Sequence, residues 1–191
     1  PEGGAVPDNQ IHVLVDEGAT RKNILSQMER LFYKADSNDV ILFYFSGHGL
    51  QNSFLPIDFD GHLKQVKHDE IKAIFEKSPA KYKMCIADAC HAGGMGKSKN
   101  VNLSSSAYYY KAFNEAKGGT AFMLSSKAKE ISIENAGLRQ GIFTHFLIKG
   151  MKGRADKNTD NVVTVKEVYD YVHYNVRFYT RNYQNPVLFG D

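Results

Sequence analysis

The sequence predicts an α/β protein in which a mostly parallel central sheet is covered by helices on both faces. Short apolar runs of strand length alternate along the 191 residues with segments whose apolar residues recur at helical spacing. Two of these runs are of the fully buried type and end in small and reactive residues, which is typical of parallel strands in open sheets. The length suits one domain with a sizeable core and is too short for two ordinary domains.

Strands are expected where branched and aromatic residues cluster between turn signals. These segments are residues 11–16, 40–46, 82–87, 120–125 and a short final strand within 185–189. A brief extended piece is expected at 54–57, where Pro56 confines it to a sheet edge or a strand end.

Helices are expected where apolar residues return every three or four positions. The first of them follows Thr20, which offers an N-cap, and its apolar face comprises Ile24, Leu25, Met28, Leu31 and Phe32. The others are residues 68–77, 106–117, 141–151 and about 164–180. From Ala92 to about Ser106 the composition changes to Gly, Ser, Lys and Asn without apolar periodicity, so we expect a mobile linker there.

Two motifs carry the chemistry. His48 lies in Ser-Gly-His-Gly after the apolar run 40–45, and Cys90 lies in Asp-Ala-Cys-His-Ala-Gly after the run 82–87. A thiol and an imidazole delivered to one sheet edge from two strands form a nucleophile and its base. Taken singly, a histidine is usually structural and a free cysteine is often buried, and Cys85, inside its strand, is assigned to the core.

The paired motifs, about 40 residues apart, resemble those of the metacaspases, in particular the prokaryotic metacaspase-like branch (orthocaspases) of the caspase superfamily, among the clan CD cysteine peptidases. Residues 55–58, 141–144 and 184–186 are also similar to segments of that family. The resemblance implies a caspase-like fold, with a peptidase domain of the p20/p10 type over residues 1–191. It implies His48 and Cys90 as the catalytic dyad, with the backbone N–H groups of Gly49 and Cys90 as the oxyanion hole. This chemistry requires no cofactor.

The resemblance also predicts what the enzyme cleaves. It places Asp88 in the pocket for the residue before the scissile bond, where an anion favours arginine and then lysine. Read without the family, Asp88 is a helix cap or a solvated acid. The resemblance further implies that the substrate lies as an added strand beside Ser125 and Ser126, which otherwise read as an ordinary strand end.

The chain departs from the family pattern at its beginning. The first strand of the superfamily, expected in space between 11–16 and 40–46, is absent from the sequence. A sheet without a central strand leaves ladder groups unpaired. We therefore expect the domain to be N-terminally incomplete and the sheet to be completed by a segment before Pro1 or by a separate processed chain. Candidate self-cleavage sites in and after the linker are Lys97, Lys99 and Lys111.

A third motif follows the predicted helix 141–151. Oxygen-bearing side chains occupy positions 1, 3, 5, 9 and 12 of an EF-hand calcium loop, and these residues are Asp156, Asn158, Asp160, Thr164 and Glu167. Asn161 stands at the sixth position, which is normally glycine. The alternative is that Thr164 and the acids cap the last helix. Calcium is therefore a possible ligand.

The bulk properties exclude several classes of partner. The net charge of +3 is carried by scattered lysines, so nucleic acid is not predicted. No apolar run approaches the roughly 20 residues that span a bilayer. Two cysteines in a chain of this size favour a reducing, cytoplasmic location.

The resulting hypothesis is a cysteine endopeptidase that acts on protein or peptide substrates after basic residues. Its regulation is expected to involve processing or calcium, in stress or cell-death signalling. The alternatives are a catalytically silent adaptor with the same fold and a calcium-binding regulatory module.

Overall fold

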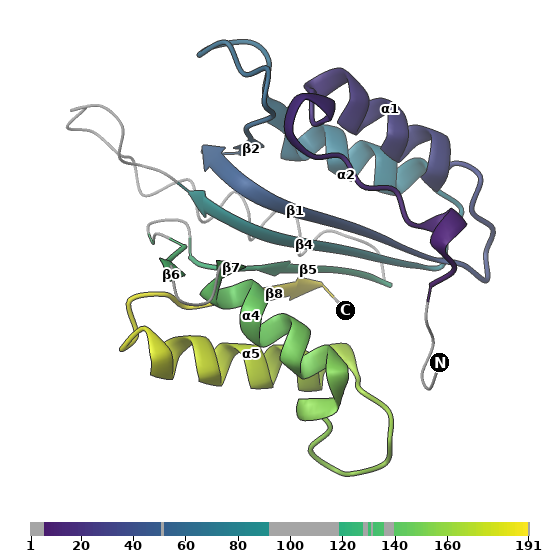
Figure 1. The fold of residues 1–191 in the computed structure, drawn as a ribbon. Coiled ribbons are helices and arrows are strands. Elements are labelled where there is room, and N and C mark those ends of the chain that lie inside the picture. The colour runs from purple at the N-terminus through teal and green to yellow at the C-terminus, as the bar shows by residue number, and fades with distance from the viewer. Residues whose placement is uncertain are drawn as a thin grey trace.

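The computed structural model describes residues 6–50, 52–91, 119–127, 130, 132–135 and 140–190, with the backbone alone for Cys90, His91, Glu134 and Asn135. A six-stranded sheet lies between two layers of helices (Figure 1). Its strand order is β3-β2-β1-β4-β5-β8, and β6 and β7 form a separate two-stranded sheet.

The strands are β1 Val40–Leu50, β2 Ser53–Phe54, β3 Val66–Lys67, β4 Tyr82–His91, β5 Thr120–Leu124, β6 Glu134–Asn135, β7 Gln140–Gly141 and β8 Val187–Gly190. The α-helices are α1 Arg21–Phe32, α2 His68–Lys77, α4 Ile142–Lys149 and α5 Val165–Tyr179, and a five-residue π-helical turn, η3 Gly150–Arg154, follows α4. Two 3-10 turns, η1 Asp8–Gln10 and η2 Asp16–Gly18, precede α1.

The centre of the sheet is parallel and its margins are antiparallel. β4 pairs in parallel with β1 on one side and with β5 on the other. β2, β3 and β8 join antiparallel, so the sheet is mixed. The predicted α/β architecture is confirmed, and the parallel strands bring the ends of β1, β4 and β5 to one edge.

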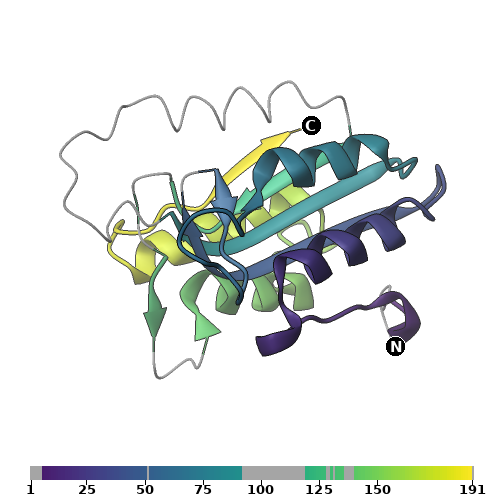
Figure 2. The same ribbon diagram turned by 90° about the horizontal axis from the view of Figure 1, so that it is seen from above.

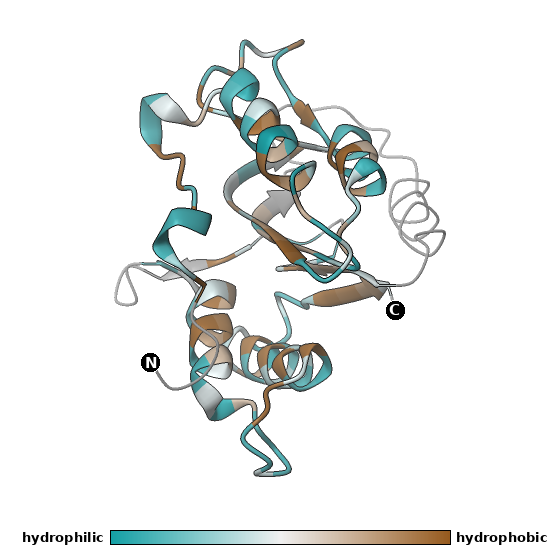
Figure 3. Ribbon diagram, turned by 90° about the vertical axis from the view of Figure 1, so that its right-hand side faces the viewer, coloured by the Kyte–Doolittle hydropathy of each residue, from teal (hydrophilic) through white to brown (hydrophobic). Residues whose placement is uncertain are grey.

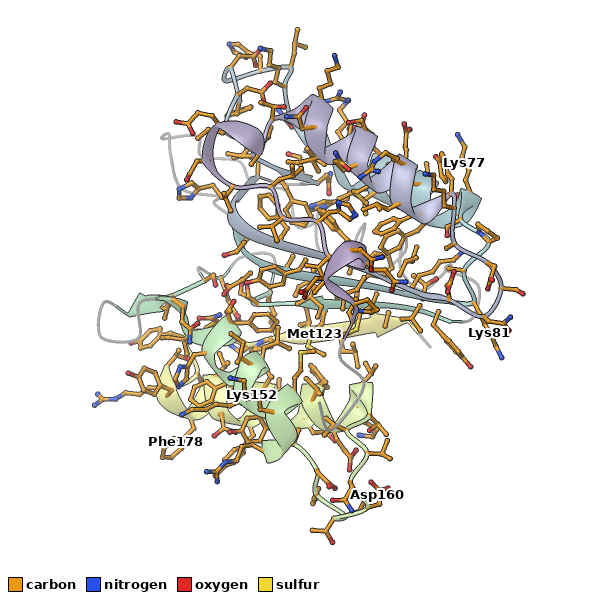
Figure 4. The ribbon with its side chains drawn as sticks, turned by 45° about the vertical axis from the view of Figure 1, so that its right-hand side comes forward. Lys77, Lys81, Met123, Lys152, Asp160 and Phe178 are labelled. Atoms are coloured by element: carbon orange, nitrogen blue, oxygen red, sulfur yellow. The ribbon has the colours of Figure 1, made fainter. Side chains whose placement is uncertain are left out.

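Residues alternate between the two faces of the sheet as the period of a strand requires. On β4, Cys85 and Ala87 pack into the core beneath α1 and α2. Ile86, between them, packs against α4 and α5 in the second core together with Met123 of β5, which points toward these helices in Figure 4. Figure 3 shows hydrophobic strand segments between the two helix layers. β4 and β5 thus bury side chains on both faces, whereas β1 buries Ile41 and leaves Val40 and Leu42 exposed, so the apolar run at 40–45 is not fully buried.

Helix starts agree with the capping signals in the sequence. Thr20 accepts a hydrogen bond from the backbone of Asn23 at the beginning of α1. Thr164 and Glu167 form a reciprocal capping box at the beginning of α5. The helix predicted at 68–77 has those bounds, whereas the one predicted at 141–151 becomes α4 followed by the π-helical turn. The predicted helix 106–117 lies outside the described residues.

One strand prediction is wrong. Residues 11–15 are not assigned to any strand, and Asp16 begins η2. Figure 2 shows this N-terminal segment alongside α1, on the β1 side of the molecule. The apolar alternation is present, but Ile11, Val13 and Val15 are exposed, and no described strand pairs with this segment. β3, β6 and β7 were not predicted, since two-residue strands carry no periodicity.

We predict that the second core tolerates little loss of volume. Phe143 of α4 is fully buried, so Phe143→Ala should lower the free energy of unfolding by about 3–5 kcal/mol. Urea denaturation followed by circular dichroism measures this. Phe178 of α5 is 77% exposed and points outward in Figure 4, so the matched change Phe178→Ala should stay within about 0.5 kcal/mol. Equal losses in the two variants would contradict this packing.

Candidate active site

The register between β1 and β4 brings the two motifs together. The strands pair residue by residue from Val40 opposite Tyr82 to Gly49 opposite His91. In this register His48 lies opposite Cys90, and Ser46 lies opposite Asp88. Partners across a ladder are about 5 Å apart, so the backbones of the two predicted catalytic residues are adjacent. The His48 residue is exposed to solvent.

The end of β1 is fixed by the turn into β2. The backbone N–H of Leu55 donates to the carbonyl of His48 at 2.9 Å. Gly49 pairs with Phe54 of β2 on one side and with His91 of β4 on the other, and it is buried. The segment that carries the histidine is therefore held between two strands. The predicted oxyanion role of the Gly49 and Cys90 N–H groups remains a prediction.

Asp88 is buried at the point where β4 meets the N-terminus of α4. Its residue is 6% exposed. The Ser132 hydroxyl donates to Oδ1 at 2.6 Å, the backbone N–H of Thr144 donates to Oδ2 at 3.2 Å, and the Thr144 hydroxyl also donates to Oδ2. Thr144 lies in the first turn of α4, so the carboxylate caps this helix from a distant strand and meets the positive end of its dipole.

The burial and hydrogen bonds of Asp88 distinguish between the interpretations of this residue as a solvated acid, a helix cap or a specificity residue. A solvated acid does not fit a residue so deeply buried, whereas a helix cap fits its hydrogen bonds with Thr144. A specificity role is compatible with capping, because a carboxylate has about four acceptor positions and three hydrogen bonds are recorded here.

The contact between Asp88 and α4 is close enough to require glycine next to it. A Cβ atom on Gly141, the N-cap residue of α4, would lie 2.3 Å from Asp88 Oδ2. Only a residue without a side chain therefore allows α4 to start against this carboxylate.

A chain of buried polar groups extends from Asp88. Gln184 is fully buried, and its amide donates to Ser132 Oγ at 3.3 Å and to the carbonyl of Ser125 at 2.9 Å. Its Oε1 accepts from the backbone of Ile133 at 2.9 Å. On the other side, Tyr44 Oη and Thr144 Oγ1 are 2.8 Å apart, and because the Thr144 proton goes to Asp88, Tyr44 is the donor. The network joins β1, β4, the segment after β5, α4 and the approach to β8.

Ser125 and Ser126, predicted to contact substrate, are both 1% exposed. The Ser125 hydroxyl donates to the carbonyl of Ala89 at 3.3 Å, and the Ser126 hydroxyl donates to the carbonyl of Glu130 at 3.4 Å. Their side chains thus serve the scaffold: Ser125 ties the segment after β5 to the residue before Cys90. The predicted contact of this segment with substrate remains a prediction.

Three residues of the site, Thr144, Ser132 and Gln184, were not predicted as its members. Thr144 and Gln184 lie in segments already recognised as similar to the family, so a signal existed for them. Ser132 carried none, because it is separated from Asp88 by 44 residues of sequence. The predicted linker and the candidate self-cleavage sites Lys97, Lys99 and Lys111 lie outside the described residues.

The predicted calcium residues are remote from this edge. α4 begins beside Asp88, and the loop containing Asp156, Asn158 and Asp160 follows the far end of that helix and of η3 (Figure 1). Thr164 and Glu167 lie at the start of α5.

Comparison with known proteins places the chain in a family. A family model described as the caspase domain matches residues 8–190. Metacaspase-2 of Trypanosoma brucei brucei is 31% identical over 111 residues, covering 47% of this chain and 32% of that protein. Metacaspase-3 of the same organism is 31% identical over 111 residues, covering 31% of its length. The chain thus spans about a third of the length of these relatives.

Solved structures agree in fold. Caspase-1 from Spodoptera frugiperda has a TM-score of 0.63 at 15% identity, covering 90% of this chain and 68% of that chain. Protein GSU0716 from Geobacter sulfurreducens has a TM-score of 0.61 at 17% identity, covering 92% of this chain and 75% of that one.

The sheet, the helix layers and these likenesses define a caspase-like α/β protein. The chain belongs to the caspase-domain family, a family of cysteine peptidases, and is similar to the metacaspases within it. Within the described residues, no helix combines the length and apolar character needed to cross a membrane.

We predict that Cys85 does not react in the folded protein. Its residue is 3% exposed, and burial raises the pKa of its thiol to about 12. Because only the thiolate is nucleophilic, iodoacetamide at pH 8 should leave Cys85 unmodified in the native chain and alkylate it in urea. Peptide mass spectrometry distinguishes the two cysteines. Alkylation of Cys85 at similar rates in both conditions would contradict this burial.

Proposed function

We propose that the chain is a cysteine endopeptidase in which Cys90 is the nucleophile and His48 is its general base. The observation that carries the proposal is the register that sets the two residues opposite each other on parallel strands. Family membership supports the reaction class. The exposed position of His48 supports access of a peptide to this edge.

The reaction proceeds by acyl transfer. His48 takes the proton of the Cys90 thiol, and Sγ attacks the scissile carbonyl to give a tetrahedral oxyanion. The N–H groups of Gly49 and Cys90 donate to that oxyanion. The C–N bond then breaks, the departing amine takes the proton from the His48 imidazolium, and a thioester remains. Water, deprotonated by His48, hydrolyses the thioester and restores the thiol.

A basic residue before the scissile bond is the specificity we propose, with arginine preferred over lysine. Asp88 supports this because its carboxylate is held by the neutral donors Ser132 and Thr144, and no ion pair among the described residues compensates its charge. A guanidinium offers two parallel N–H donors to such a group, whereas an aspartate would be repelled.

We predict that fluorogenic peptides ending in Arg are cleaved faster than those ending in Lys, and that those ending in Asp are cleaved slowest. Cys90→Ala and His48→Ala should each reduce kcat/KM by about 10³-fold or more, since each removes half of the dyad. Cys85→Ala is the matched control and should retain activity. Initial rates are compared after circular dichroism confirms folding. Faster cleavage after Asp would refute the specificity. A folded, inactive wild-type chain would favour the silent adaptor.

Asp88→Asn tests the pocket separately. Loss of one charge-assisted hydrogen bond should lower kcat/KM for the Arg peptide by about 10- to 100-fold and narrow the preference for Arg over an uncharged residue. The ratio of the two rates is the measurement, because partial unfolding would lower both rates alike. An unchanged ratio would exclude Asp88 from the pocket.

We further propose that the open side of β1 accepts an additional strand, from an upstream segment or a second processed chain. On this side β1 pairs with β2 at Gly49 and Leu50, and His48 bonds to Leu55, but no described strand covers residues 40–47. A long unpaired edge of this kind is a template for strand addition. Exposed apolar side chains line it, including Val40 at 66% and Leu42 at 46%.

The direction of the backbone groups makes this edge testable. The carbonyl of His48 bonds to Leu55, and that of Asp39 bonds to Tyr82 of β4. Because successive residues alternate, the N–H groups of Leu42, Tyr44 and Ser46 face the open side and those of Ile41 and Phe43 face β4. We predict fast amide exchange by NMR at the first three and protection at the other two. Protection should appear at all of them once the chain is extended upstream with its native sequence. Continued fast exchange there would contradict the added strand.

The setting of the activity is also proposed. A free buried thiol at Cys85 supports a reducing, cytoplasmic environment. Self-processing at Lys97, Lys99 or Lys111 follows from the proposed specificity. Regulated proteolysis in stress or cell-death responses is the role that the metacaspase likeness supports.

A further inference from the structure

Tyr44 lies on the face of β1 that is turned toward α4. Its neighbours Phe43 and Phe45 pack into the core beneath α1 and α2, and successive side chains of a strand point to opposite faces. Tyr44 and His48 are an even number of residues apart, so both point to the other face, on which α4 and α5 lie in Figure 1. The row of side chains that ends at the proposed catalytic histidine thus includes an aromatic ring.

Tyr44 is exposed although its hydroxyl is bonded. The residue is 41% exposed, and its Oη donates to Thr144 Oγ1 at 2.8 Å. The Thr144 hydroxyl in turn donates to Asp88 Oδ2. These two hydrogen bonds hold the ring close to the carboxylate, with one hydroxyl group between them. Because most of the surface of a tyrosine is its ring, part of the ring is accessible beside the anion that we propose to bind arginine.

The chain itself supplies no cation to this ring. In the described part of the chain, the recorded contacts of a lysine with a ring are those of Lys81 with Tyr82 and of Lys149 with Phe146. The ion pairs recorded there do not include Asp88 either. An accessible aromatic face beside a carboxylate whose charge is not compensated is complementary to a cationic group.

The ring lies where a long side chain would reach it. A strand advances about 3.3 Å per residue, so Asp88, two positions before Cys90 on β4, lies about 7 Å from it along the strand. Tyr44 pairs with Ile86, which lies two positions further from Cys90. A side chain that starts at a carbonyl bound to Cys90 and follows this face of the sheet therefore meets Asp88 first and Tyr44 next.

We propose that Tyr44 is a specificity-determining residue whose ring stacks on the guanidinium of the arginine that Asp88 binds. The inference rests on the proposed function and adds what separates arginine from lysine at this site. A carboxylate attracts both cations, whereas the planar and weakly hydrated guanidinium stacks on an aromatic face more favourably than the compact, strongly hydrated ammonium group. The hydroxyl of Tyr44 orients the ring through Thr144, and the ring makes the contact.

Cleavage rates of two fluorogenic peptides that differ only in ending with Arg or with Lys test the role of the ring. Tyr44→Leu removes the ring and should lower kcat/KM for the Arg peptide about 3- to 30-fold, the range of a cation–π contact. The Lys peptide should lose less, so the ratio of the Arg rate to the Lys rate should fall about threefold or more. Tyr44→Phe keeps the ring and should keep this ratio within about twofold of the wild-type value.

Tyr33→Leu is the matched control, because Tyr33 is 40% exposed and lies at the end of α1, on the other face of the sheet, so both rates should be unchanged. The ratio does not depend on how much of a variant is folded. Equal losses for the two peptides in Tyr44→Leu would overturn the inference. A ratio as low in Tyr44→Phe as in Tyr44→Leu would overturn it as well, because the hydroxyl would then carry the selectivity. Either result leaves the proposed peptidase intact, since the wild-type chain still cleaves after Arg.

Binding to the inactive Cys90→Ala chain decides the inference without catalysis. In isothermal titration with a tripeptide amide that ends in Arg, adding Tyr44→Leu should raise Kd about threefold or more, and adding Tyr33→Leu should leave Kd unchanged. A wild-type chain that cleaves no peptide would refute the proposed function, and this titration would still uphold or overturn the contact with Tyr44. Absence of binding by the folded Cys90→Ala chain, or the same Kd with and without Tyr44→Leu, would overturn it.

Discussion

The pairing of β1 with β4 is the constraint on which the rest of the molecule depends. Ten consecutive residue pairs are in register, and the last of them include His48 opposite Cys90 and Gly49 opposite His91. Successive residues of β4 point alternately into the two cores. A shift of β4 by one residue relative to β1 would therefore move every side chain of the strand to the opposite face of the sheet. The register that buries Cys85 and Ile86 on opposite sides is therefore the same one that aligns the two reactive motifs.

The second organising element is the carboxylate of Asp88. It projects from β4, caps α4 through Thr144, and joins Gln184 through Ser132. Buried polar groups of this kind are stable only when every member is bonded, and the network specifies how five segments meet. The anion that we propose to recognise arginine is consequently also part of the scaffold. In this proposal, substrate recognition and the placement of α4 depend on the same residue.

Local patterns in the sequence predicted most of the fold. Apolar runs located β1, β4 and β5, and apolar residues at helical spacing located α1, α2 and α5. The strand predicted at 11–16 is wrong. Its residue types favour a strand, but a strand also needs a neighbour to pair with, and none of the described strands pairs with this segment. His48 and Cys90, which the register sets opposite each other, could be singled out because they lie in short motifs, and their catalytic roles remain a proposal supported by the likeness to metacaspases. The contact of Asp88 with Ser132 could not be derived, because a contact across 44 residues leaves no periodic trace, whereas Thr144 lies in a segment similar to the family.

A crystal structure of the chain with a peptidyl-arginine aldehyde tests the central claim most directly. The account predicts a covalent bond from Cys90 Sγ to the aldehyde carbon, an imidazole nitrogen of His48 within about 3 Å of the reacting atoms, and the guanidinium on the Asp88 carboxylate. An adduct on another residue, or an arginine side chain directed away from Asp88 with His48 beyond reach of the adduct, would contradict it.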